Sequence, residues 1–183
     1  MTEIIEQVMA NAECIYSEAE VESAIDAMAN SINSKMSGLN PIVISVMNGG
    51  LVFAGKLLTK LTFPLQVDYC HASRYQNDME GGELLWKVLP QMDLADRNIL
   101  VVDDIYDQGH TLQSILTALQ AQGANSIMMA VLVNKLHDRK ALTDFSIDFV
   151  GLEVPDKFVF GYGMDYRGYL RNAAGIYAVC TNQ

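Results

Sequence analysis

The chain has few cysteines, no long apolar run and a shortage of basic side chains, and each shortage excludes a class of protein. Its three cysteines, Cys14, Cys70 and Cys180, are an odd number without metal-ligand spacing, which argues against a disulfide framework and indicates a reducing compartment. No uncharged run approaches the roughly 20 apolar residues of a membrane helix. Residues 1–6 carry acids instead of the basic start of a secretion signal. We therefore expect a cytoplasmic protein without a membrane partner.

Basic residues are scarce, since 12 Lys and Arg stand against 22 Asp and Glu and the formal net charge is -10. Nonspecific binding to nucleic acid requires clustered Lys and Arg, so this balance argues against a nucleic-acid partner. Half of the 183 residues are hydrophobic, which is enough for a sizeable core and argues against disorder. We expect one domain over residues 1–183.

The most informative segment is residues 99–111, Ile-Leu-Val-Val-Asp-Asp-Ile-Tyr-Asp-Gln-Gly-His-Thr. Its apolar run predicts a buried parallel strand, and the apolar residues at helical spacing after it predict a helix. Backbone N–H groups at such a helix start bind phosphate, and Gly109 lets the chain pass close to the ligand. Asp103 and Asp104 would repel a phosphate unless they hold sugar hydroxyls or a magnesium ion. The segment therefore predicts a site for a phosphorylated sugar.

Strands and helices alternate along the chain, which is typical of an α/β fold with a mainly parallel twisted sheet and helices on both faces. Ligands bind at the carboxyl ends of such strands, so we expect the loops at residues 47–50 and 103–111 to face one cavity. The three histidines, His71, His110 and His137, are too dispersed for a metal cluster and are assigned structural or peripheral places. Helices are predicted at residues 18–36, 50–61 and 110–122, and strands at residues 41–47, 65–71, 83–89, 98–105, 126–133 and 149–154.

Residues 99–111 resemble the phosphoribosyl pyrophosphate signature of the type I phosphoribosyltransferases, in which two acids after an apolar strand precede Asp-x-Gly-x-Thr. The resemblance implies that Asp103 and Asp104 position the ribose hydroxyls, directly or through Mg²⁺. It makes Asp107 the general base. A Walker-type phosphate loop is a poorer alternative, because Gly-Lys-Ser/Thr is missing.

The same resemblance places the sugar 5-phosphate on the turn that follows the two acids. This turn consists of Asp107, Gln108, Gly109, His110 and Thr111. Gln108 stands where the family frequently has Thr, so a hydroxyl contact to the phosphate is absent. The backbone N–H of Gln108 remains available, and Thr111 keeps a hydroxyl at the helix start.

Two further loops carry the resemblance. Asn48 and Gly49 match the loop that contacts pyrophosphate, often beside a cis peptide, although purine enzymes of the family commonly have Lys or Arg in place of Asn48. Ser73, Arg74 and Tyr75 begin a polar segment that the resemblance identifies as a mobile lid over the reacting centre. A plain strand-to-helix turn and an ordinary surface hairpin are the alternative interpretations of these two loops.

Near the C-terminus, residues 155–166 resemble a stretch of the hypoxanthine-guanine phosphoribosyltransferases, Pro-Asp-Lys-Phe-Val-x-Gly-Tyr-x-x-Asp-Tyr. The resemblance implies that Phe158 stacks on the purine and that Val159 offers backbone groups to its edge. It assigns Asp165 to a metal or a metal-bound water, and Arg171 to pyrophosphate.

Lys135 matches the lysine of this family that donates to the purine O6, with the adjacent Asn134 as the alternative. An ammonium group has only donors, so it suits the carbonyl of hypoxanthine or guanine and opposes the amino group of adenine. A 6-oxopurine is therefore the expected base.

The resemblance as a whole implies Mg²⁺-dependent transfer of the 5-phosphoribosyl group from phosphoribosyl pyrophosphate to N9 of hypoxanthine or guanine. The implied architecture is the type I phosphoribosyltransferase fold, with a small hood built from residues 1–40 and 155–183. Relatives form dimers or tetramers, so a homodimer or homotetramer is expected. Two rivals stay open: a xanthine-preferring enzyme, and a non-catalytic regulator that binds nucleotide or RNA on the same fold.

Overall fold

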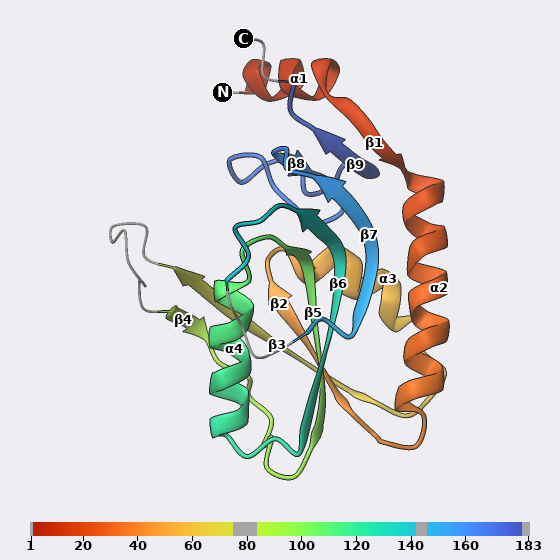
Figure 1. Ribbon diagram of the computed structural model, residues 1–183, viewed down its shortest axis with the longest axis vertical. Coiled ribbons are helices and arrows are strands. Elements are labelled where there is room, and N and C mark those ends of the chain that lie inside the picture. Colours follow the sequence, from red (N-terminus) through yellow and green to blue (C-terminus); the bar gives the residue numbers. More distant parts are fainter. Residues whose placement is uncertain (1, 75–83, 142–145, 181–183) are drawn as a thin grey trace.

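The centre of the molecule is a twisted six-stranded sheet in the order β4-β3-β2-β5-β6-β7 (Figure 1). The structure is a computed structural model that describes residues 2–74, 84–141 and 146–180. Four of the neighbouring strand pairs are parallel, and β3 and β4 pair antiparallel. The six strands are β2 (Ile42–Met47), β3 (Gln66–Arg74), β4 (Leu84–Val88), β5 (Asn98–Tyr106), β6 (Ser126–Leu136) and β7 (Phe149–Pro155).

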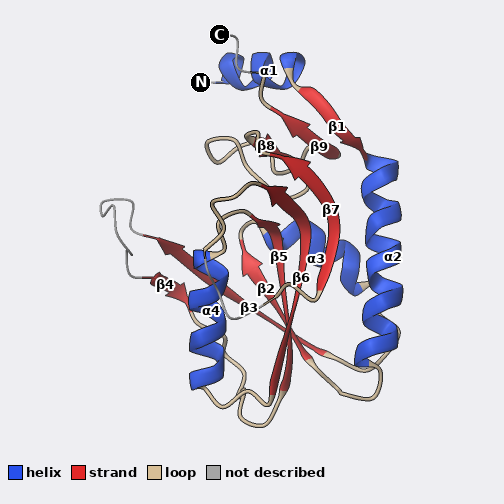
Figure 2. Cartoon of the chain, viewed as in Figure 1, coloured by secondary structure: helices blue, strands red, loops and turns tan. Residues whose placement is uncertain are grey.

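Helices cover both faces of this sheet (Figure 2). The helices are α1 (Thr2–Asn11), α2 (Glu18–Met36), α3 (Gly50–Leu58) and α4 (His110–Ala121). Val43 and Leu100 share an apolar cluster with α2 and α3, whereas Ile44 and Val101 share another cluster with α4. Successive side chains of β2 and β5 therefore enter opposite cores, as in strands that are buried on both faces.

The helix α2 begins at a capping box. The Ser17 hydroxyl accepts a hydrogen bond from the Glu20 N–H, and the Glu20 carboxylate accepts one from the Ser17 N–H. One face of the helix is buried at helical spacing and packs on the sheet. The buried residues of this face are Val21, Ile25, Met28, Ala29, Ile32 and Met36.

A second, three-stranded sheet joins segments from both ends of the chain. Its order is β1-β9-β8, with both pairs antiparallel, and its strands are β1 (Glu13–Ser17), β8 (Val159–Phe160) and β9 (Gly175–Ala178). Figure 1 shows it beyond the arrowheads of the central parallel strands. Sequence analysis predicted none of these three strands, because strands of two to five residues are too short to show a period.

The central elements confirm the predicted mainly parallel α/β architecture. The helix at residues 18–36 has the predicted bounds, and the ends of the other predicted elements move by three residues or fewer. Most of the predicted lid, residues 75–83, lies outside the described residues. In the parts that the structure describes, no helix is long and apolar enough to cross a membrane. The division of the chain into domains stays a prediction.

We expect Ile32→Ala to lower the free energy of unfolding by about 2 to 5 kcal/mol, because it leaves a cavity where α2 packs on the sheet. Ile32 has no exposed surface and belongs to the larger apolar cluster. Urea unfolding followed by circular dichroism measures the loss. Ser23→Ala, on the exposed side of the same helix, is the control and should stay within about 0.5 kcal/mol of the parent. Equal urea midpoints for Ile32→Ala and Ser23→Ala would contradict the packing of Ile32 between α2 and the sheet.

Candidate functional site

A cavity of about 570 Å³ opens at the carboxyl ends of β2 and β5. Residues 46–49 line one side of it, and residues of the segment 103–112 line another. His71, Lys87 and Arg171 complete the wall from β3, β4 and the C-terminal part of the chain. The two loops that were predicted to face one cavity therefore do so. The carboxyl ends of parallel strands are the usual ligand site in open α/β sheets.

Asp103 and Asp104 are buried carboxylates in this cavity, 8% and 9% exposed. The Asp103 side chain accepts a hydrogen bond of 2.9 Å from the Asp104 N–H. Burial raises the pKa of both carboxyls, and the neighbouring charge of Asp104 raises the pKa of Asp103 further. The charged pair is therefore costly by itself and is suited to a ligand that supplies a cation or hydroxyl donors.

The loop after β2 packs directly against these carboxylates. A Cβ atom on Gly49 would overlap the Asp104 side chain, so this position must lack a side chain. The Met47–Asn48 peptide just before it is cis, as the resemblance implied. This loop lines the same cavity as the turn at residues 107–111.

The start of α4 has the form of an anion site. Gly109 is the N-cap residue with φ 88°, a left-handed conformation that favours glycine. Its carbonyl accepts from the Gln113 N–H, so the helix begins here. The N–H groups of the first turn have no partner within a helix, and they lie at the positive end of the helix dipole. His110 and Thr111 line the cavity at this point, so a phosphate is the expected occupant.

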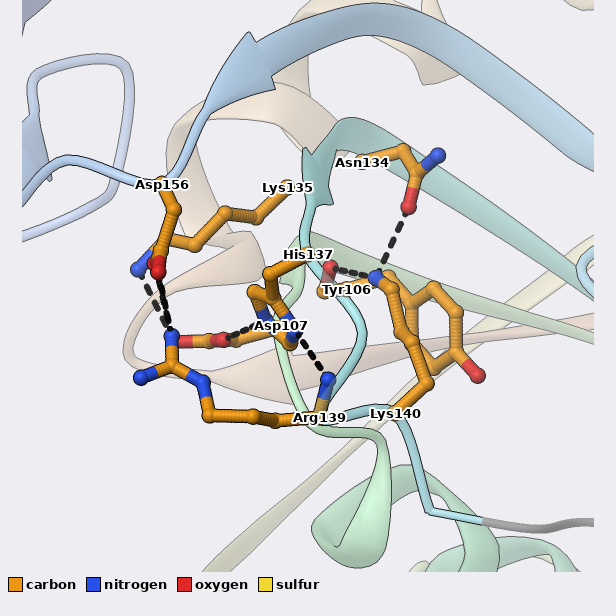
Figure 3. A network of polar contacts seen from close by, with 8 residues as sticks. All are labelled: Tyr106, Asp107, Asn134, Lys135, His137, Arg139, Lys140 and Asp156. Carbon is orange, nitrogen blue, oxygen red and sulfur yellow. Dashed lines mark hydrogen bonds and ion pairs between the residues drawn. The ribbon is translucent and has the colours of Figure 1, made fainter.

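Asp107 projects from the turn between β5 and α4 and contacts two side chains, one near the end of β6 and one just after it (Figure 3). Lys135 Nζ lies 2.9 Å from Asp107 Oδ2, and His137 Nε2 lies 2.6 Å from Oδ1. Partial burial raises the pKa of Asp107, but the hydrogen bonds from Lys135 and His137 outweigh it and hold the pKa below its usual range. The carboxylate is therefore charged and oriented, and its side chain is still 42% exposed.

Known proteins share this sequence pattern. Residues 11–167 match the family model described as a phosphoribosyl transferase domain. The chain belongs to the phosphoribosyltransferase family. A hypoxanthine-guanine phosphoribosyltransferase of Bacillus subtilis is 34% identical to it over 161 residues, which cover 86% of this chain and 87% of that protein.

Solved structures agree with the sequence comparison. A hypoxanthine phosphoribosyltransferase from Staphylococcus aureus has a TM-score of 0.87 at 26% identity, covering 93% of each chain. A hypoxanthine-guanine-xanthine phosphoribosyltransferase has a TM-score of 0.82 at 28% identity, covering 91% of this chain and 96% of the other. The protein is thus a phosphoribosyltransferase enzyme with the type I fold.

The phosphoribosyltransferase signature residues lie together in the structure. Asp103, Asp104 and residues 107–111 line the same cavity as Asn48, Gly49 and Arg171. Ser73 and Arg74 end β3, where their backbones pair with β4, and Tyr75 lies outside the described residues. The individual roles of these residues stay predictions.

The residues assigned to the purine have different surroundings. Phe158 is 55% exposed and lines a second cavity of about 630 Å³, with its ring edge-on to Tyr166. Val159 is buried in β8 and pairs with Ala178. Asp165 accepts from the Gly168 N–H at 2.6 Å and pairs with Arg171 at 2.7 Å. Both carboxylate oxygens of Asp165 therefore have protein partners.

Sequence reasoning missed three basic side chains at the site. His137 was assigned a structural or peripheral place, but its ring contacts Asp107 directly. His71 and Lys87 line the cavity beside Asn48, the position where the family commonly has a cation. No periodic signal pointed to His137, because it lies just beyond the end of β6 in an irregular segment. For Lys87 no signal existed, since only strand pairing brings β4 to the cavity.

Asp103 and Asp104 fit a magnesium ion. Magnesium prefers oxygen ligands, keeps several waters and is usually held by one or two carboxylates together with substrate phosphates. Within residues 2–74, 84–141 and 146–180, no group of three or more His, Cys, Asp and Glu side chains could hold a metal. The buried pair therefore offers the protein part of such a site, and a sugar phosphate would supply further oxygens.

We expect Asp103→Asn to raise the melting temperature at pH 7.5 in the presence of a chelator. Burial raises the folded-state pKa of this carboxyl above its unfolded value, so ionisation at neutral pH destabilises the folded state and the neutral amide removes that cost. A gain of roughly 2 to 4 °C corresponds to about 1 kcal/mol in a domain of this size. The gain in melting temperature should be smaller at pH 4.5, because protonation there removes the destabilising charge of Asp103 in the parent protein.

Differential scanning fluorimetry at both pH values checks this prediction. Asp138→Asn removes the same formal charge from an exposed side chain and is the matched control. A lower melting temperature for Asp103→Asn than for the parent at both pH values would show that the Asp103 charge is not a source of instability.

Proposed function

We propose that the protein transfers the 5-phosphoribosyl group from phosphoribosyl pyrophosphate to N9 of hypoxanthine or guanine, releasing pyrophosphate. The observation that carries the proposal is Asp107 paired with Lys135 beside a phosphate-binding helix start. The turn at residues 107–111 would hold the 5-phosphate through backbone N–H groups. The purine would then lie beside this turn, within reach of both Asp107 and Lys135.

Asp107 would act as the general base for the purine. Its pKa lies below the usual range, so it is ionised at neutral pH and can accept the N7 proton as N9 attacks the sugar C1. This transfer avoids a cationic purine product. The N7 proton can be taken up because a carboxylate has about four lone-pair sites and two of them are engaged here.

Lys135 would select the base. Its ammonium, which lies 2.9 Å from Asp107 Oδ2, would donate to O6 and offset the negative charge that develops there. Adenine presents an amino group at this position, so two donors would face each other. A 6-oxopurine is therefore the proposed substrate class.

Asp103 and Asp104 would hold the ribose hydroxyls and one face of a magnesium ion. The ion would neutralise charge on the leaving pyrophosphate. Arg171, Lys87 and Gly49 line the side of the cavity where that group would lie, and Asn48 leaves the cationic contacts to Arg171 and Lys87. Asp165 would orient Arg171 through their 2.7 Å ion pair.

The two rivals make different demands on the site. A xanthine-preferring enzyme would use the same residues, and one structural relative is named a hypoxanthine-guanine-xanthine phosphoribosyltransferase. A non-catalytic regulator would need the phosphate turn but has no use for an ionised, oriented Asp107. The observed pair of donors on Asp107 therefore favours catalysis.

Self-association in the cytoplasm is part of the same proposal. Leu51, Val67 and Tyr69 are 55%, 50% and 43% exposed and line a mostly apolar hollow of about 300 Å³ between α3 and β3. Grouped apolar side chains on a surface are typical of protein interfaces. They support a homodimer or homotetramer.

Pyrophosphate release from phosphoribosyl pyrophosphate tests the function, with hypoxanthine, guanine, xanthine, adenine and uracil offered in parallel. We expect turnover with hypoxanthine or guanine, little with adenine or uracil, and loss of turnover when EDTA removes magnesium. If xanthine gave the highest turnover, the protein would be the xanthine-preferring enzyme instead. Folded protein that binds the sugar phosphate and turns over no base would support the regulator.

Asp107→Asn should lower turnover by about 10² to 10⁴-fold, because an amide cannot accept the N7 proton. Binding of IMP or GMP, measured by isothermal titration calorimetry, should persist. Asp138→Asn, which removes an exposed neighbouring carboxylate, should keep parental turnover. Undiminished activity of Asp107→Asn would remove Asp107 as the base.

A further inference from the structure

The segment that follows β6 folds back onto the turn that carries Asp107 (Figure 3). His137 contacts the Asp107 carboxylate, and the Ala141 N–H donates to the Gln108 carbonyl at 2.8 Å. Lys140 Nζ donates to the Tyr106 carbonyl at 2.7 Å. We name residues 137–141 the return segment. Its contacts reach three successive residues, Tyr106 at the end of β5 and Asp107 and Gln108 in the turn, so it fixes the first part of that turn.

The His137 ring has a defined orientation within the return segment. Its side chain is 4% exposed. The Arg139 N–H donates to His137 Nδ1 at 3.1 Å, so Nδ1 uses its lone pair as an acceptor. The ring proton is thereby assigned to Nε2, which donates to Asp107 Oδ1 at 2.6 Å. A backbone N–H therefore sets the tautomer that makes His137 a donor to the carboxylate.

Asp107 has a donor on each oxygen, but the two donors have different freedom. Lys135 holds Oδ2 through a flexible chain and, in the proposed function, must also reach the purine O6. His137 holds Oδ1 through a nearly buried ring that is itself held by the Arg139 N–H. When Lys135 turns toward the base, the contact from His137 remains.

We propose that His137 is a positioning residue, which keeps the Asp107 carboxylate aimed at the purine while Lys135 contacts O6. This inference rests on the proposed function, because it assigns Asp107 the role of general base. Removing the Nε2 donor frees the carboxylate to rotate. A small misplacement of a reacting group can reduce rate by about 10²-fold.

The pKa of Asp107 provides a measure of its hydrogen bond from His137 that does not depend on the reaction rate. The charged and titratable groups that face it are Lys135 from β6, together with His137 and Lys140 from the return segment. A donor to the ionised carboxylate lowers its pKa, so loss of the His137 donor raises the pKa of Asp107. If Asp107 must be ionised for activity, the variant then loses activity at a higher pH than the parent does as the pH is lowered.

The test compares two amides at position 137 that differ by one methylene group. His137→Gln places an amide N–H near the position of Nε2 and should still reach Asp107. His137→Asn is too short to reach Asp107 but can still accept from the Arg139 N–H. His137→Leu is a second variant without a donor, so a folding defect in one substitution leaves the comparison intact.

Leu136→Ala is the matched control. Leu136 lies between Lys135 and His137, is 51% exposed and faces the other side of the strand, because successive side chains alternate. It should keep the parental rate and pH profile. Circular dichroism and melting temperature establish that each variant is folded.

The readout is kcat/KM for hypoxanthine across pH, with saturating phosphoribosyl pyrophosphate and magnesium. We expect His137→Asn and His137→Leu to lose about 10- to 100-fold, with KM for phosphoribosyl pyrophosphate within about twofold of the parent. The midpoint of the acidic limb should move to higher pH in both. His137→Gln should recover most of the rate and keep a midpoint close to that of the parent.

Parental rates in the folded variants without a donor would overturn the inference. Equal losses in Gln, Asn and Leu variants with an unchanged acidic midpoint would also overturn it, since this result indicates a packing role. The proposed function fails differently, because the parent protein itself would then release no pyrophosphate with any base.

Discussion

Two adjacent carboxylates buried at the carboxyl ends of parallel strands are the constraint on which the rest of this site depends. Asp103 and Asp104 are less than a tenth exposed, and burial raises the pKa of both. Such a pair is unfavourable in an empty protein and favourable beside a cation and sugar hydroxyls. The close packing of Gly49 on Asp104 leaves that compensation to a ligand on the cavity side.

The net negative charge of the whole chain opposes the binding of an anionic ligand at this site. With a net charge of -10, the protein repels a polyanionic sugar phosphate at long range. Attraction must come from short-range donors: the helix start at Gly109 and the cations Lys87 and Arg171. These groups come from separate elements, so the cavity forms only after the sheet has assembled. At physiological salt, dissolved ions screen this repulsion over distances of about 8 to 10 Å.

The two side chains that contact Asp107 differ in length and in how firmly they are held. Lys135 contacts Asp107 through a long side chain, whereas the His137 ring is short, nearly buried and held by a backbone N–H. Sequence reasoning found the first residue through the family resemblance and overlooked the second. The chain beyond Leu136 is irregular, and irregular segments carry no period from which a fold-back could be predicted.

The sequence by itself determined the central elements and the turn between β5 and α4, because both are local. Apolar runs and helical spacing located β2, β5, α2 and α4, and Gly109 after the two acids marked the start of α4. Only the tertiary structure decided which distant side chains meet there. Lys87 reaches the cavity by antiparallel pairing, and His137 reaches Asp107 because the return segment folds back. These contacts join residues far apart in sequence, and their geometry depends on the complete sheet.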